Sequence, residues 1–141
     1  MSDLLAAGII LFILDEYHIP KFLLLRCSKG KHWSPPKGHC DEHEVDNLLT
    51  TAFRETYEET GIKKDNIKIY DFEKEIHYKA WGRNKTVVYF LGECTNTTVV
   101  LSHEHDQYTW AYIEEARSLI EHESLFEIFI QALEKLNIEF N

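Results

Sequence analysis

Three glutamates at helical spacing are the first residues in this sequence that could do chemistry. Glu55, Glu58 and Glu59 stand at positions i, i+3 and i+4, which share one face of a helix. Carboxylates stacked in this way repel one another, and nothing in local helix physics rewards the arrangement. A divalent cation would reward it, because hard cations such as Mg²⁺ bind clustered carboxylate oxygens. For such a motif alone, a solvated glutamate-rich helix face is the alternative.

Two features upstream of the glutamates favour a metal–phosphate site over a solvated face. Pro35 and Pro36 fix a rigid turn that presents Lys37, Gly38 and His39. An acidic loop then leads into the helix, with Asp41, Glu42, Glu44 and Asp46. The turn, the loop and the helix together indicate a metal–phosphate site more specifically than any one of them does.

The glutamates need a helix that begins near Asp46 or Asn47 and ends before Gly61. Either residue could serve as the N-cap, and glycine suits the left-handed position that follows a helix end. Apolar residues recur at i, i+4 spacing on the opposite face, namely Leu49, Phe53 and Tyr57. We therefore expect the helix to bury that side and to hold metal on the other.

Apolar stretches elsewhere predict the elements that support this helix. Strands are expected over Leu4–Leu14, Lys21–Cys27, Ile67–Tyr78, Thr86–Leu91 and Tyr108–Ile113. Residues His32–Pro36 are extended, Ala80–Lys85 reads as a hairpin turn, and helices are expected at Glu114–Ile120 and Ser124–Leu136. The combination predicts an α/β fold in which a mixed β-sheet is sandwiched between α-helices.

Composition and charge limit the class of protein. The 141 residues suffice for one domain with a core. A net charge of −9 argues against a nucleic-acid backbone as the main partner, although bound cations could neutralise a polyphosphate ligand. The three cysteines form no CxxC pair, which favours a reducing compartment. Without a basic n-region or an apolar run of roughly 20 residues, we expect no membrane partner and a location in the cytoplasm, with the nucleus as an additional option.

Taken together, the motifs resemble a known superfamily. Gly38, Glu44, Arg54, Glu55, Glu58, Glu59, Gly61 and Ile62 are similar to the Nudix box, Gly-x5-Glu-x7-Arg-Glu-U-x-Glu-Glu-x-Gly-U, where U is bulky and apolar. The segments Trp33–His39 and Leu101–His105 resemble two signatures of the asymmetrical diadenosine tetraphosphate hydrolases within it. The resemblance implies the Nudix fold and a single Nudix hydrolase domain over residues 1–141.

The sequence departs from this pattern in two places. Two extra residues separate Glu44 from Arg54, so that Glu44 fills the first acidic position when counted from Gly38 and Asp46 fills it when counted back from Arg54. We expect the extra residues to bulge in the loop, and either acid could orient Arg54. The family tends to place an aromatic residue near position 122 to stack on adenine, whereas this chain has His122.

The resemblance also implies a reaction and roles for residues. Diadenosine tetraphosphate would be hydrolysed to ATP and AMP by water attack on phosphorus, with Mg²⁺ or Mn²⁺ as cofactor. Glu55, Glu58, Glu59 and Glu104 are the implied metal ligands. Glu104 is also a candidate general base, although alone it would read as a loop acid. Arg54 is implied to hold a neighbouring carboxylate in place.

A second group of residues is implied to bind the substrate: His32, Lys37, His39, Tyr78 and Lys85. Lysine offers phosphate a point charge, and tyrosine can stack on adenine. Without the resemblance, Lys37 could equally be a surface lysine and Tyr78 a core-edge residue. His103 and His105 flank Glu104; they could bind metal, but the oxygen preference of Mg²⁺ favours contacts to phosphate.

Other functions stay open at this point. One is RNA 5′-end processing or removal of pyrophosphate from inositol phosphates, and the acidic charge weighs against long RNA. Another is a nucleotide-binding protein that has lost catalysis, against which the intact glutamates argue. The expected partner is a small dinucleoside polyphosphate, and we expect a monomer.

Overall fold

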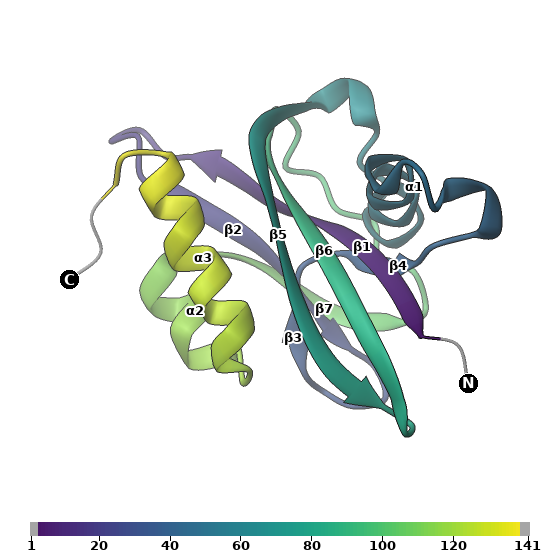
Figure 1. Cartoon of the computed structure of the whole chain (residues 1–141). Helices are drawn as coiled ribbons and strands as arrows, with labels where there is room; N and C mark the ends of the chain where they lie inside the picture. The colour runs from purple at the N-terminus through teal and green to yellow at the C-terminus, as the bar shows by residue number, and fades with distance from the viewer. Residues whose placement is uncertain (1–2, 139–141) are drawn as a thin grey trace.

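The computed structural model describes residues 3–138 (Figure 1). The strands are β1 (Leu4–Leu14), β2 (Pro20–Cys27), β3 (Trp33–Ser34), β4 (Lys37–His39), β5 (Ile67–Ala80), β6 (Arg83–Cys94) and β7 (His105–Ala111). The helices are α1 (Leu48–Thr60), α2 (Ile113–Leu119) and α3 (Glu123–Lys135), with short 3-10 helices η1 (Glu42–Glu44) and η2 (Lys64–Asn66). No helix in this part of the chain is long and apolar enough to cross a membrane.

The strands form one mixed sheet in the order β3-β2-β1-β6-β5, with β4 paired to β1 and β7 paired to β2. β1 and β6 run parallel, and the other pairs are antiparallel. Helix α1 covers one face of the sheet, while α2 and α3 cover the other (Figure 1). The predicted sandwich of a mixed sheet between helices is therefore confirmed.

β1 is the strand on which the sheet is built, and its predicted bounds are confirmed. Ile10 and Phe12 enter the core shared with α2 and α3, whereas Ile9 and Leu11 enter the core beneath α1. A strand buried on both faces must be apolar at consecutive positions, which explains the unbroken apolar run.

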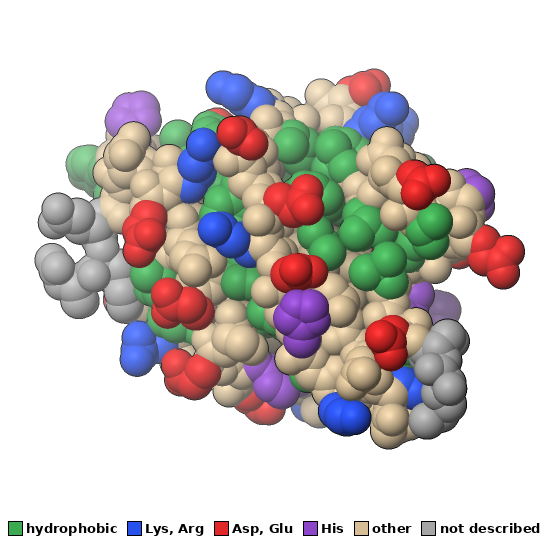
Figure 2. All heavy atoms as spheres, in the orientation of Figure 1, with side chains coloured by type: hydrophobic (Ala, Val, Ile, Leu, Met, Phe, Trp, Pro, Cys, Tyr) green, Lys and Arg blue, Asp and Glu red, His purple; other side chains and the backbone are tan. Residues whose placement is uncertain are grey.

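Helix α1 follows the N-cap Asn47 and ends at Gly61, whose φ of 76° confirms the left-handed end. The expected buried face is confirmed only in part: Leu49 and Phe53 are partly buried and pack against the core beneath α1, whereas Tyr57 is 52% exposed. Figure 2 shows hydrophobic side chains at the surface over α1. The buried residues are instead Thr51, Ala52, Thr56, Glu59 and Thr60. Small side chains on this face let the helix approach the sheet closely, and that approach buries Glu59.

Other boundaries differ because strand pairing extends beyond the apolar runs. The β5–β6 turn contains only Trp81 and Gly82, so the expected Ala80–Lys85 turn was too long. β7 begins at His105 because this residue still pairs with Cys27 of β2. The helix expected over Ser124–Leu136 is α3, which starts one residue earlier and has Leu136 as its C-cap. Its buried residues are all apolar: Leu125, Phe126, Ile128, Phe129, Ala132 and Leu133.

Candidate active site

A pocket of about 370 Å³ is lined by residues of the segment from His32 to Asp41, which includes β3 and β4, and by residues of α1 and β6. Glu104 just before β7, His105 at the start of β7 and Cys27 at the end of β2 complete its lining. Eight of the ten predicted site residues line it: His32, Lys37, His39, Arg54, Glu55, Glu59, Lys85 and Glu104. Residues from distant parts of the sequence therefore face one volume.

The turn that carries Lys37 is pressed between β1 and α1. Gly8 of β1 permits the contact, since a Cβ there would overlap the Pro36 carbonyl oxygen and lie 2.7 Å from the Lys37 Cβ. The Ile9 N–H donates to that carbonyl at 3.3 Å. On the other side, the Lys37 N–H donates to Glu59 Oε1 at 3.1 Å. The turn is thus held on both sides, which orients Lys37 and Glu59 relative to one another.

Gly38 brings the backbone against the Glu55 carboxylate. A side chain at residue 38 would overlap the carboxyl group of Glu55. Only glycine leaves this space open, so packing against the Glu55 carboxyl group accounts for glycine at this position.

Two carboxylates of α1, those of Glu55 and Glu59, lie in an environment that opposes their ionisation. Burial, with added repulsion from Glu58, raises the pKa of Glu55 to about 7. Burial likewise raises the pKa of Glu59 to about 8, against the lowering effect of the Lys37 N–H bond. Glu104 adds further repulsion at both positions. A cation among these groups would offset both burial and repulsion, and their oxygen donors fit Mg²⁺ or Mn²⁺.

Other residues that line the pocket carry positive charge. Lys85 is buried, and burial together with the charge of Lys37 lowers its pKa to about 8. The pKa values of His32 and His39 are also lowered, chiefly by burial and then by the neighbouring lysines. Groups that repel one another in this way would be stabilised by an anion. The pocket therefore brings carboxylates and positively charged side chains together, and a metal–phosphate complex would fit that combination of charges.

Glu44 is the acid that holds Arg54. Its two carboxylate oxygens accept hydrogen bonds from Arg54 Nε and Nη2, each at 2.9 Å. The Thr51 hydroxyl and the Asp41 N–H also donate to Glu44, at 2.9 and 3.0 Å. The Arg54 hydrogen bonds lower the pKa of Glu44 to about 2. Glu44 therefore takes the role for which Asp46 was the rival.

Arg54 connects this buried acid to the rim of the pocket. Its Nη2 donates to the His39 carbonyl at 2.9 Å, and its Nη1 donates to Glu58 Oε1 at 2.8 Å. The guanidinium thus ties α1, the η1 segment and β4 together. This supports a positioning role for Arg54, as expected from the resemblance.

Two predicted residues, Glu58 and Tyr78, do not line the pocket. Glu58 is exposed beside Arg54, although its charge reaches Glu55. Tyr78 lies opposite Lys85 in the β5–β6 register, with Lys85 Nζ 5.7 Å from the centre of its ring. The His122 ring stacks nearly parallel to the Tyr78 ring, with 6.2 Å between centroids and 17° between planes. Tyr78 therefore lies next to Lys85, which does line the pocket.

The loop that carries Glu104 is held by residues that sequence reasoning missed. The Ser28 N–H donates to the Glu104 carbonyl at 2.9 Å, and the Ser28 hydroxyl donates to the His103 carbonyl at 3.0 Å. Asp106 accepts hydrogen bonds from Arg26 at 2.8 and 2.9 Å and from Lys31 at 2.6 Å. These partners are about 75 to 80 positions apart in the sequence, where no local pattern could reveal them.

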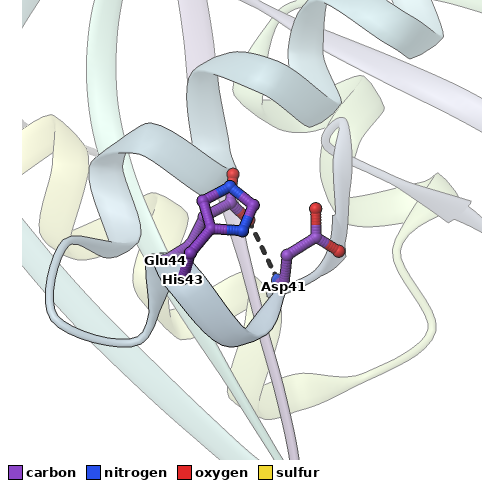
Figure 3. Close-up of side chains that lie close together, drawn as sticks. All are labelled: Asp41, His43 and Glu44. Atoms are coloured by element: carbon purple, nitrogen blue, oxygen red, sulfur yellow. Dashed lines mark hydrogen bonds between the residues drawn. The ribbon is translucent and has the colours of Figure 1, made fainter.

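Asp41, His43 and Glu44 form a separate cluster (Figure 3). Their possible ligand atoms lie within 4.8 Å of one another. Both Glu44 oxygens, however, already accept hydrogen bonds from Arg54, and one also accepts the Asp41 N–H bond drawn in the figure. The cluster is better explained as the support of Arg54 than as a metal site.

Comparison with known proteins agrees with this geometry. The profile of the NUDIX domain family matches residues 4–132. This chain belongs to the NUDIX domain family. A NUDIX domain is thus confirmed, and hydrolases of this family use divalent metal ions.

Individual relatives of this NUDIX domain narrow the resemblance. A mouse protein named bis(5′-nucleosyl)-tetraphosphatase [asymmetrical] is 45% identical over 125 residues, covering 81% of this chain and 82% of the mouse protein. The pig protein of the same name is 44% identical over the same shares. The crystal structure of a C. elegans Ap4A hydrolase binary complex matches with a TM-score of 0.84 and 33% identity over 95% of each chain. The predicted likeness to this group is confirmed.

Proposed function

We propose that this NUDIX domain is an asymmetrical bis(5′-nucleosyl)-tetraphosphatase that hydrolyses diadenosine tetraphosphate to ATP and AMP. The observation that carries the proposal is that one pocket is lined both by carboxylates, Glu55, Glu59 and Glu104, and by the lysines Lys37 and Lys85. The relatives that bear this name support the choice of substrate.

Each residue then has a defined task. Glu55, Glu58, Glu59 and Glu104 would hold Mg²⁺ or Mn²⁺, which neutralises phosphate charge and lowers the pKa of water. Lys37, Lys85, His32 and His39 bind the phosphate chain, and Tyr78 stacks on one adenine. Glu104 accepts a proton as the water oxygen bonds to phosphorus and the bridging oxygen departs with the leaving nucleotide. Arg54 positions Glu58 and the β4 backbone through the contacts described above.

The direct test is incubation of the purified protein with diadenosine tetraphosphate and Mg²⁺, followed by chromatography of the products. We expect ATP and AMP in equal amounts. ADP as the sole product would overturn the asymmetric cleavage. A higher kcat/KM on RNA 5′ ends or on diphosphoinositol phosphates would overturn the substrate assignment.

Three broader properties belong to the same proposal: a single domain over residues 1–141, a monomer, and a location in the cytoplasm, with the nucleus as an additional option. Light scattering tests the monomer, and imaging of a tagged protein tests the location. A dimer at working concentration would overturn the monomer without affecting the proposed chemistry.

A further inference from the structure

The β5–β6 hairpin ends in a tryptophan that the fold does not explain. Trp81 and Gly82 form its two-residue turn, with φ values of 52° and 75°. Such turns favour Asn-Gly, because a bulky side chain is disfavoured in the left-handed region. Trp81 is nevertheless 86% exposed, the largest exposed fraction among the large hydrophobic residues that the structure describes. Neither backbone preference nor packing within residues 3–138 therefore accounts for an indole here.

The charges around Trp81 point to the chemistry of its ligand. Lys79, Arg83 and Lys85 lie in the hairpin end, and no acidic residue occurs between positions 77 and 85. The whole chain, by contrast, has a net charge of −9. An exposed aromatic ring among cations suits a nucleotide, because the base stacks on the ring and the phosphates meet the positive charges.

The hairpin connects this exposed ring to the active-site pocket. Tyr78 pairs with Lys85, and Ala80 pairs with Arg83, so all four side chains lie on the same face of the sheet. Lys85 lines the pocket, and the charge of Arg83 reaches His39. Figure 1 shows the hairpin end projecting beyond the neighbouring strands. A line of positive charge thus runs from the pocket toward Trp81.

We propose that Trp81 stacks on the second nucleobase of the dinucleotide, the one that Tyr78 does not hold. This inference rests on the proposed function, since only a ligand with two bases can occupy both rings. Trp81 lies three residues beyond Tyr78, which on a strand is about 10 Å. Two riboses joined by four flexible phosphates can span that distance while the phosphates pass Arg83 and Lys85.

The kinetic test compares diadenosine tetraphosphate with adenosine 5′-tetraphosphate, which lacks the second base. We define a ratio as kcat/KM for diadenosine tetraphosphate divided by kcat/KM for adenosine 5′-tetraphosphate. In Trp81→Asn, we expect this ratio to fall about tenfold. Trp81→Tyr keeps an aromatic ring, so its fall in the logarithm of this ratio should be at most half of the fall in Trp81→Asn. Tyr17→Asn removes another exposed aromatic side chain, from the β1–β2 turn, and serves as the matched control with an unchanged ratio. An unchanged ratio in Trp81→Asn would overturn the proposal.

A binding test separates this inference from the hydrolytic function. Trp33 and Trp110 are partly buried, so Trp81 supplies the most solvent-exposed indole emission. Titration with a methylene-bridged, non-hydrolysable diadenosine tetraphosphate and Mg²⁺ should quench this emission in the wild type and not in Trp81→Asn. If the wild type hydrolyses neither tetraphosphate but shows this quenching, the proposed function fails and the Trp81 site stands. If the wild type hydrolyses diadenosine tetraphosphate but shows no quenching of Trp81, the proposed function stands and the Trp81 site is overturned.

Discussion

Glu59 combines burial with charge more strongly than the other carboxylates facing the pocket. It is 5% exposed, receives the Lys37 N–H, and has a pKa near 8. Burying a carboxylate without a full counter-charge costs stability. A residue that would cost less, such as glutamine, fits the same space, so the acid is best explained by what it binds.

Glu59→Gln should therefore separate activity from stability. We expect turnover with Mg²⁺ to fall at least about 100-fold, in line with the loss of transition-state charge stabilisation. Tm measured in EDTA should stay equal or rise, because the amide oxygen can still accept the Lys37 N–H. Glu127→Gln on the exposed side of α3 is the control and should change neither quantity. Turnover within tenfold of the wild type would contradict the metal assignment.

Glu44 differs from Glu59, because its buried negative charge is paired with the Arg54 guanidinium. Arg54→Met would leave this 2% exposed carboxylate without its guanidinium and should lower the free energy of unfolding by about 3 kcal/mol. Arg54→Lys should lose less, since it keeps the charge but not the two-pronged geometry. Urea unfolding monitored by circular dichroism measures the difference.

Asp46→Asn is the matched control for this pair. It changes the other acid that the sequence offered as a partner for Arg54, and Asp46 is exposed. Its free energy of unfolding should match the wild type within about 0.5 kcal/mol. A loss as large as that of Arg54→Met would show that Asp46 shares the support of the arginine.

At the scale of elements, the active site depends on how α1 and the loop before β7 are held. The helix is fixed by close packing of small residues on the sheet, whereas the loop is fixed by polar ties to β2 and the residues after it. Arg26 and Lys31 both hydrogen-bond Asp106 and hold its pKa well below its usual range. The position of Glu104 thus depends on partners outside the pocket chemistry.

Asp106→Asn should weaken both ion pairs and loosen the loop. We expect kcat to fall about tenfold with KM within about twofold, because Glu104 would spend less time in position. In a Glu104→Gln background, the same change should have almost no further effect on kcat. Independent, additive losses in the double variant would instead assign Asp106 a general structural role.

At the scale of the whole molecule, the pocket makes stability depend on pH and metal. In the folded protein, the pKa values of Glu55 and Glu59 rise from an ordinary 4.5 to about 7 and about 8. Below pH 4.5 both groups hold their protons in either state. As the pH rises toward 8, the unfolded chain releases these protons first, and unfolding becomes more favourable.

We therefore expect the carboxylates to lower the free energy of unfolding progressively from about pH 4.5 to about pH 8 in EDTA. The lowered pKa values of His32 and His39 act in the opposite sense near pH 6.5, so the wild type is compared with Glu59→Gln. The variant should show a weaker decline. The stabilisation lost from Glu44 appears only as the pH falls from 4.5 toward 2, outside this window.

Mg²⁺ should reverse the decline, because it binds the ionised carboxylates. The rise in Tm on adding Mg²⁺ is expected to grow between about pH 6 and about pH 8 and to shrink in Glu59→Gln. Thermal unfolding with Mg²⁺ or EDTA across this range checks both statements. A metal-dependent shift that is independent of pH would contradict the proposed role of the raised pKa values.

The sequence by itself determined the elements whose signals are local. The apolar run of β1, the glycine that ends α1 and the i, i+3, i+4 spacing of the glutamates each depend on neighbouring residues. Six of the eight predicted residues that line the pocket also lie within positions 32–59, so their spacing in the sequence already indicated that they are near one another. Such signals can be recognised without knowledge of the rest of the chain.

Only the tertiary structure decided which face of α1 is buried and what supports the site. Periodicity shows which residues share a face of a helix, but close packing on the sheet selects the face that is buried. In α1 the small residues Thr51, Ala52 and Thr56 are buried, whereas Leu49 and Phe53 are partly buried and Tyr57 is exposed. The choice of Glu44 for Arg54 depended on the path of the loop. The ties of Ser28 and Asp106 join segments about 75 to 80 residues apart, and such contacts arise only once the sheet has brought those segments together.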